Sequence, residues 1–85
     1  MEINENFYTT PDLNLATVIS LSYPLDSIER LSDRKMAFVF KREEGLDQLI
    51  ESFWKRGLMV EPNQYSEHRK MLIARMGNEE GFGGF

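Results

Sequence analysis

The chain contains no cysteine among its 85 residues, and this absence removes two classes of protein at once. Without thiols there is neither a disulfide framework nor a thiolate metal site. A single histidine, His68, leaves few ligands for any other metal centre. No apolar run approaches the roughly 18–20 residues of a membrane span, and residues 1–6 show neither the basic nor the apolar region of a secretory signal. We therefore expect a cytoplasmic protein with no membrane contact and no cofactor.

The composition is that of a globular protein. Apolar residues make up 41% of the chain and charged residues 28%, which excludes a disordered tract or a fibrous repeat. The net charge is −4, and it is unevenly spread: residues 1–33 hold six acids and one base, whereas residues 34–76 hold nine bases and six acids. Duplex phosphate repels so acidic a chain at long range, although the 34–76 block offers a local basic face.

The first third of the chain predicts a buried helix. Thr10 is a suitable N-cap, and Pro11 suits the first helical position, where its missing N–H is not needed. Residues 12–22 are apolar on nearly every face, so we expect this helix to be largely buried. It ends before Pro24, because the residue preceding a proline avoids the helical conformation. Upstream, residues 7–8 fit a hydrophobic staple or a short strand.

The next segment predicts a β-hairpin. Residues 25–31 form its first strand, 32–34 its turn and 35–41 its second strand. The second strand is apolar on both faces, which indicates a strand that is central in a small sheet or covered on both sides. We expect the helices to pack on its bulkier face, which holds Met36, Phe38 and Phe40.

Two further helices follow. Residues 46–54 have amphipathic spacing, and Gly57 fits the left-handed position just past the helix end. Residues 58–60 are a short apolar run that reads as an edge strand or an extended link. Pro62 then starts a third helix at its first position, with Glu61 as a poorer N-cap than Asp or Asn.

These segments predict a small single α+β domain over residues 7–76, in the order helix, β-hairpin, helix, short strand, helix. Residues 1–6 are expected to be a flexible N-terminus. Residues 77–85 contain four glycines, two acids and two phenylalanines, and we expect a flexible acidic tail. The predicted core consists of Leu13, Ala16, Ile19, Ile28, Phe38, Phe40, Leu46, Leu49, Ile50, Phe53, Val60, Tyr65 and Leu72.

The order of several motifs resembles that of a known family. The motifs lie at residues 7–13, 37–40, 46–54 and 60–65. Together they resemble a small prokaryotic and phage family that is catalogued only as a domain of unknown function, and the resemblance covers roughly residues 7–76. It implies an origin in bacteria or their viruses, no assigned activity and no functional residue to carry over.

The sequence offers little for catalysis. Glu67, next to His68, cannot converge with it on one ion, because adjacent helical residues point in different directions. A Ser–His–acid device lacks a nucleophile-elbow pattern. The glycines of the tail have no strand before them and no helix after them, so they do not form a phosphate loop. We expect no catalytic residue, no metal site and no small-molecule substrate.

The candidate binding residues lie in three places. Trp54 either closes the core or forms a partly exposed anchor flanked by cations. Bases on the third helix could extend that surface, and the tail phenylalanines could dock on a partner, unless the tail is an end of no consequence. The candidate partner-binding residues are Trp54, Lys55, Arg56, Arg69, Lys70, Phe82 and Phe85.

Two functions follow from this surface. The first is a non-enzymatic protein-interaction module, an accessory or inhibitory factor of phage or mobile-element origin that acts on a host or viral protein, with a protein partner or self-association. The alternative is a small nucleic-acid-binding factor that uses the basic 34–76 block, since an aromatic with interleaved bases suits single strands.

Overall fold

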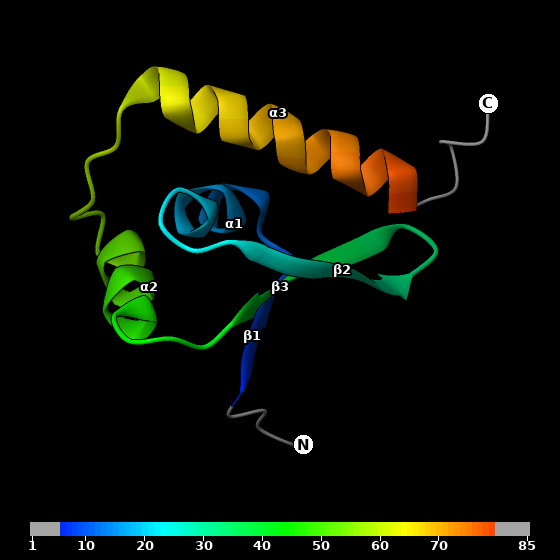
Figure 1. Ribbon diagram of the computed structural model, residues 1–85, viewed down its shortest axis with the longest axis horizontal. Helices are drawn as coiled ribbons and strands as arrows, with labels where there is room; N and C mark the ends of the chain where they lie inside the picture. Colours follow the sequence, from blue (N-terminus) through cyan, green and yellow to red (C-terminus); the bar gives the residue numbers. More distant parts are fainter. Residues whose placement is uncertain (1–5, 80–85) are drawn as a thin grey trace.

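The computed structural model describes residues 6–79. Within that range three helices accompany a three-stranded antiparallel sheet, so the predicted α+β class is confirmed (Figure 1). The elements in chain order are β1 (Phe7–Thr10), α1 (Leu13–Ser20), β2 (Leu25–Ser32), β3 (Lys35–Lys41), α2 (Leu46–Trp54) and α3 (Pro62–Glu79).

The sheet has the strand order β1-β3-β2, with β3 in the centre. Phe38 pairs with Thr10 on one side and with Ile28 on the other. All five residues from Met36 to Phe40 are buried. A strand that is apolar on both faces needs cover on both faces and both edges, so the prediction that this strand is central is confirmed.

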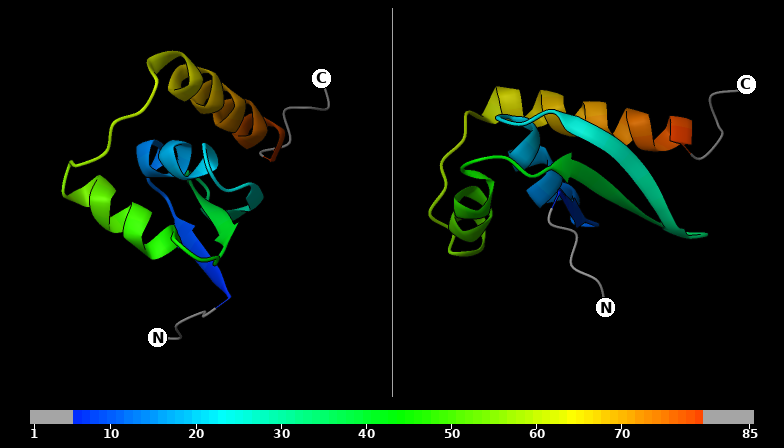
Figure 2. Two further views of the ribbon diagram at one scale, coloured as in Figure 1. Left: turned by 60° about the vertical axis from the view of Figure 1, so that its left-hand side comes forward. Right: turned by 60° about the horizontal axis from the view of Figure 1, so that its bottom comes forward.

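Helix α1 covers the aromatic face of the sheet. Leu15 and Ile19 are 0% exposed and share one core cluster with Phe38 and Phe40. Helices α2 and α3 then pack on α1, and α3 also contacts β2. Figures 1 and 2 show α1 at the centre of the molecule, with α2 and α3 on different sides of it. This arrangement explains why α1 is apolar on nearly every face.

The predicted core is largely confirmed. Every residue predicted to belong to it is buried or half-buried except Val60, which is 40% exposed. Val60 was expected to be covered as part of a short strand, but it lies in an extended connection that pairs with no strand. Sequence reasoning left out several residues that are buried in the structure, namely Leu15, Thr17, Val18, Met36, Ala37 and Val39.

Of the two interpretations of residues 58–60, the extended link is confirmed, and the short strand named in the predicted order of elements is wrong. In the part of the chain that is described, the third strand of the sheet is β1, which precedes α1. Residues 58–60 lie beside α1 and α2 and not along the outer edge of β1 or β2, so they pair with no strand. They form an extended link between α2 and α3 instead.

The first helix starts two residues later than expected. Asp12, not Thr10, is the N-cap, and its Oδ1 accepts from the Leu15 amide at 3.0 Å. Thr10 pairs with Phe38 as the last residue of β1, and its Oγ1 accepts from the Asp12 amide at 3.1 Å. Pairing in the sheet holds Thr10 in an extended conformation, so the next good capping residue begins the helix.

The end of α2 also differs from the prediction. Arg56, not Gly57, occupies the left-handed position, with a φ of 60°. The Arg56 amide donates to the Phe53 carbonyl at 3.0 Å, and the Gly57 amide donates to the Ser52 carbonyl at 2.9 Å. These two bonds form a Schellman motif, in which glycine usually holds the position that Arg56 takes here.

Arg56→Gly is expected to raise the free energy of unfolding by about 0.5–1 kcal/mol, because glycine adopts the left-handed conformation without the steric cost of a side chain. The matched control is Lys55→Gly, at a φ of −83°, which is expected to lower stability by about 0.5–1 kcal/mol. Thermal unfolding followed by circular dichroism compares the two. A lower melting temperature for Arg56→Gly would contradict this assignment of the helix end.

Helix α3 runs to Glu79, three residues beyond its expected end at Met76. The predicted tail at 77–85 thus begins as helix. A single glycine costs a helix only about 1 kcal/mol, and the helix is already anchored by Leu72, which is 3% exposed, and by Met76 at the edge of the core. The tail residues Phe82 and Phe85 lie outside the described residues, as do residues 1–5.

Candidate interaction site

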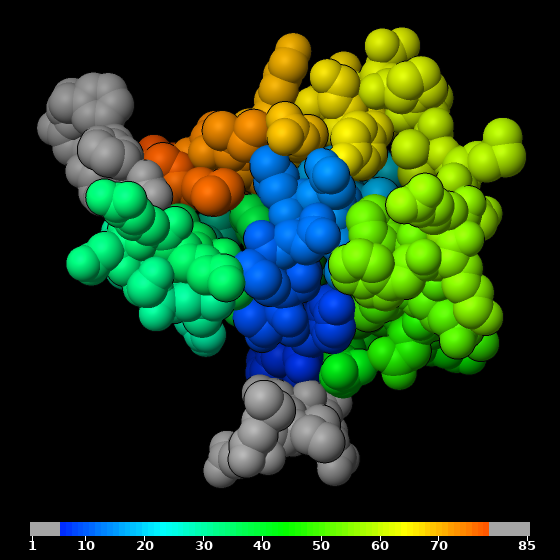
Figure 3. Space-filling view, turned by 180° about the vertical axis from the view of Figure 1, so that it is seen from behind, coloured from blue at the N-terminus to red at the C-terminus, as the bar shows by residue number. Residues whose placement is uncertain are grey.

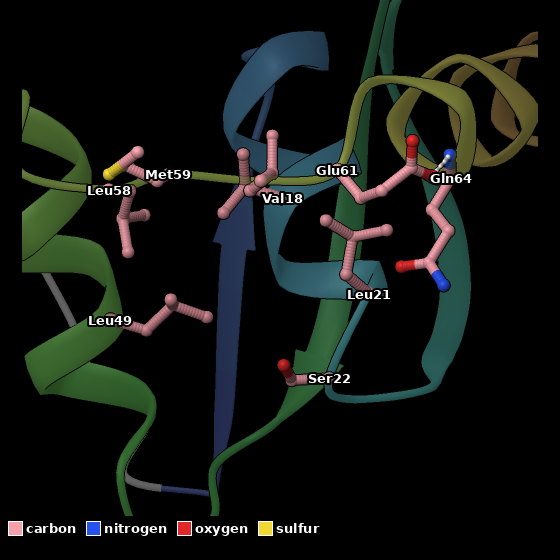
Figure 4. A pocket seen from close by; sticks show the side chains of 9 residues that line it. Val18, Leu21, Ser22, Leu49, Leu58, Met59, Glu61 and Gln64 are labelled. Carbon is pink, nitrogen blue, oxygen red and sulfur yellow. Dashed lines mark hydrogen bonds between the residues drawn. The ribbon is translucent and has the colours of Figure 1, made fainter.

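A groove whose lining residues are mostly apolar lies between α2 and α3, next to the C-terminal end of α1. Its volume is about 300 Å³. The 55–61 link between the two helices runs across this groove, which we therefore call the link groove (Figure 4). It is lined by Val18, Leu21, Ser22, Leu49, Leu58, Met59, Val60, Glu61 and Gln64.

The lining comes from three separate stretches of the chain. Helix α2 contributes Leu49, and the link contributes Leu58, whose side chain lies on the same side of the groove (Figure 4). Leu21 lies across from them at the end of α1, with Ser22 beside it. The apolar side chains form the walls, and the polar Glu61 and Gln64 lie at one end. Such a hollow suits an apolar side chain better than a charged ligand.

The mouth of the groove carries the most exposed large apolar residue of the described chain. Met59 is 96% exposed, and its neighbour Val60 is 40% exposed. Figure 3 shows the yellow-green link projecting at the edge of the molecule between α2 and α3. A single exposed apolar residue is unremarkable, but one beside an apolar hollow extends a contiguous patch of the kind that proteins use for binding.

Glu61 is the one formally charged residue of the lining, and it caps α3. Its two carboxylate oxygens accept from the Asn63 amide at 3.0 Å and from the Gln64 amide at 2.8 Å. These backbone hydrogen bonds lower the pKa of Glu61 below its ordinary value. The sequence predicted a poor cap here. Glu61 caps the helix because its side chain is long enough to fold back to both amides. Pro62, the first residue of the helix, has no N–H that needs a partner.

The groove is held open by contacts at both of its sides. On the α3 side, the Tyr65 hydroxyl donates to Asn14 Oδ1 at 2.9 Å, which ties α3 to the start of α1. On the α2 side, Leu49 and Phe53 pack against the core. The link is therefore suspended between two helices that are each anchored on α1, and the hollow exists before any partner binds.

Ser20 and His68 form a pair that sequence reasoning did not foresee. The Ser20 Oγ lies 3.1 Å from His68 Nδ1, and the Ser20 hydroxyl donates to the Thr17 carbonyl at 2.7 Å. With the hydroxyl proton on the Thr17 carbonyl, the His68 tautomer that carries its proton on Nδ1 completes the pair by donating to Ser20 Oγ. A serine nucleophile needs the opposite arrangement, in which the imidazole accepts its proton. The pair is accounted for as a link between α1 and α3.

Trp54 is largely exposed and does not close the core. It is 59% exposed, and its ring meets that of Phe53 edge-on, with the centroids 5.0 Å apart. Trp54 follows Leu49 by five residues, so the two side chains leave α2 about 140° apart. The predicted anchor therefore lies on a different flank of α2 from the link groove.

The predicted cations are divided between two helices. Lys55 and Arg56 follow the end of α2, whereas Arg69 and Lys70 lie in the middle of α3, and all four are exposed. Lys55 Nζ lies 3.7 Å from Glu51 Oε2. Figure 1 shows these two helices on different sides of α1.

A second hollow, of about 230 Å³, lies on the sheet face that points away from α1. Its centre is Val39, which pairs with Thr9 of β1 and Ser27 of β2. Two acids, Asp26 and Glu29, are part of its lining. This hollow is therefore more polar and more acidic than the link groove.

The described range, residues 6–79, contains no group of three or more histidine, aspartate or glutamate side chains placed to hold a metal ion. None of the helices in the same range combines the length and apolar character that would let it cross a bilayer.

A family of known proteins matches most of this chain. Neither the curated proteins nor the solved structures gave a match to this chain. Residues 5–78, which include every element of the fold except the last residue of α3, match a family described as "Domain of unknown function (DUF5659)". The predicted resemblance to a domain of unknown function is thus confirmed, and the chain belongs to this family.

Proposed function

We propose that this chain is a non-enzymatic protein-interaction module and that the link groove is its docking surface. The observation that carries the proposal is the position of Met59, 96% exposed at the mouth of an apolar hollow of about 300 Å³. An apolar residue beside an empty apolar hollow gains the most from a partner that covers both.

The charge distribution around the groove supports the same function. The centres of protein–protein interfaces are depleted of charged residues and enriched in methionine and aromatics. The lining has a single formal charge, Glu61, whose oxygens are engaged by backbone amides. Trp54, with Lys55 and Arg56 next to it, supplies a second exposed anchor on the other flank of α2.

The setting that we propose is cytoplasmic and bacterial or phage-derived. There the chain would act as an accessory or inhibitory factor on a host or viral protein. This part of the proposal rests on the order of the motifs over residues 7–76, which resembles that of a small prokaryotic and phage family.

The experiment compares the proteins captured by three forms of the chain: the unmodified chain, Met59→Asp and Met71→Asp. Met59→Asp places a charge at the mouth of the groove and is expected to lose the captured protein. Met71→Asp is the matched control, because Met71 is also an exposed methionine, at 56%, but lies on α3 and outside the groove lining. If all three forms retain the same proteins equally, the link groove is not the docking surface.

A further inference from the structure

We infer that the partner of the link groove is a second copy of this chain, whose Met59 side chain enters the groove. This inference rests on the proposed function, because it names the occupant of the same surface. Two copies related by a two-fold axis would each insert Met59 into the hollow of the other.

The shape of the patch carries this inference. A protruding apolar side chain and an apolar hollow lie next to each other on one surface. A surface that holds both parts is complementary to itself, which is the requirement for an isologous dimer. Methionine suits the inserted position, since its unbranched and polarisable side chain adapts to irregular hollows.

Charge selects this patch over the sheet-face hollow. Each copy has a net charge of −4, so two copies repel each other, and the repulsion is weakest where their contact carries little charge. The link groove brings one engaged carboxylate from each copy. The sheet-face hollow would instead bring together Asp26 and Glu29 from both copies, and like charges so placed oppose association.

The exposed apolar residues of α3 are less suitable for self-association. Met71 and Ile73 are 56% and 45% exposed, but each lies one helical turn from an arginine, Arg75 and Arg69 respectively. A two-fold contact through this face would place arginines of the two copies close together. The lining of the link groove, by contrast, contains no base.

The dimer is expected to be weak. The contact involves a handful of side chains, well short of the roughly 800 Å² per partner of a standard interface. We expect a Kd on the order of 100 µM. At such an affinity the groove is open in dilute solution and closed by a second copy when the chain is concentrated, so self-association competes with any other partner for the same surface.

Sedimentation equilibrium of the full chain, from about 10 µM to about 1 mM, brackets that Kd. The expected result is a mass that rises from monomer toward dimer. Met59→Asp is expected to raise the Kd at least about tenfold, and Met71→Asp to leave it unchanged. Circular dichroism establishes that both variants are folded. A monomer at every concentration, or a dimer that tolerates Met59→Asp, overturns the inference.

A second measurement locates the contact. Nuclear Overhauser spectra are recorded on a mixture of a copy with labelled methionine methyls and a copy with labelled valine and leucine methyls. The Met59 methyl of one copy is expected to contact the Val18 or Leu49 methyls of the other. A dimer without these contacts overturns the inference. If the chain is monomeric but loses a captured protein on Met59→Asp, the inference fails and the proposed function stands.

Discussion

Replacing Phe40 with alanine is expected to lower the free energy of unfolding by about 3–5 kcal/mol, the usual cost of removing a large aromatic side chain from a core. Phe40 is 0% exposed and lies on the central strand, paired with Tyr8 on one side and Leu25 on the other. Its ring fills the layer between the sheet and α1, so its loss opens a cavity where three elements meet.

Such a loss is large for this protein, because a chain of 85 residues has a total stability of about 4–13 kcal/mol. Urea unfolding followed by circular dichroism measures the effect. Leu31→Ala is the control, since Leu31 is 49% exposed at the end of β2, and a change within about 0.5 kcal/mol is expected. Equal losses at Phe40 and Leu31 would contradict the described core.

Gly45→Ala is expected to lower the free energy of unfolding by about 2–4 kcal/mol, from backbone strain and a lost hydrogen bond together. Gly45 has a φ of 89°, a conformation that residues with side chains rarely adopt. An added Cβ would lie 2.7 Å from the Tyr23 hydroxyl oxygen, which now donates to the Glu44 carbonyl at 2.7 Å. The substitution therefore disturbs both the start of α2 and its tie to the end of α1.

The matched control is Gly77→Ala. A Cβ at Gly77 meets nothing within 4 Å, and the residue lies inside α3, so alanine there is expected to raise stability by about 0.5–1 kcal/mol. Opposite signs for the two substitutions, measured by thermal unfolding, are the predicted result. A stabilising Gly45→Ala would show that α2 does not start as described.

The sequence was sufficient to predict the elements with strong local signals. The spacing of Leu46, Ile50 and Phe53 identified α2, and the alternation from Met36 to Phe40 identified the central strand. The segments that were predicted wrongly are those whose conformation depends on whether they pair with a strand distant in the sequence. Thr10 is a good cap by residue type, but it stays in β1 because it pairs with Phe38. The run at 58–60 has strand-like residues, but it lies beside α1 and α2 and not along an edge of the sheet.

The link groove could not be predicted, because its lining comes from three distant stretches of the chain, 18–22, 49 and 58–64. Val18, Leu49 and Gln64 have no relation in the sequence and meet only after α2 and α3 pack on α1. The run of Leu58, Met59 and Val60 was the available signal. An apolar run between two helices that finds no strand to join must either cover a core or remain exposed, and Met59 is exposed.

Binding through the predicted site residues stays a prediction. Trp54 is an exposed side chain of the kind that anchors binding, although it lies away from the groove. Nucleic-acid binding through Lys55, Arg56, Arg69 and Lys70 stays an alternative prediction. Binding to an oligonucleotide would weaken steeply as salt rises. An apolar contact between two chains of net charge −4 would not weaken in this way, because salt screens their mutual repulsion.

The central claim is that the link groove, among the exposed apolar surfaces, is the one that binds protein. Methionine oxidation tests it within a single molecule, because Met59 and Met71 are both exposed but only Met59 lies at the groove. Three samples are treated briefly with peroxide: the chain at low concentration, the chain at high concentration and the chain bound to a captured partner. Mass spectrometry then measures the sulfoxide formed at each methionine. We predict that the ratio of oxidised Met59 to oxidised Met71 falls on concentration or complex formation. An unchanged ratio, or selective protection of Met71, would contradict the claim.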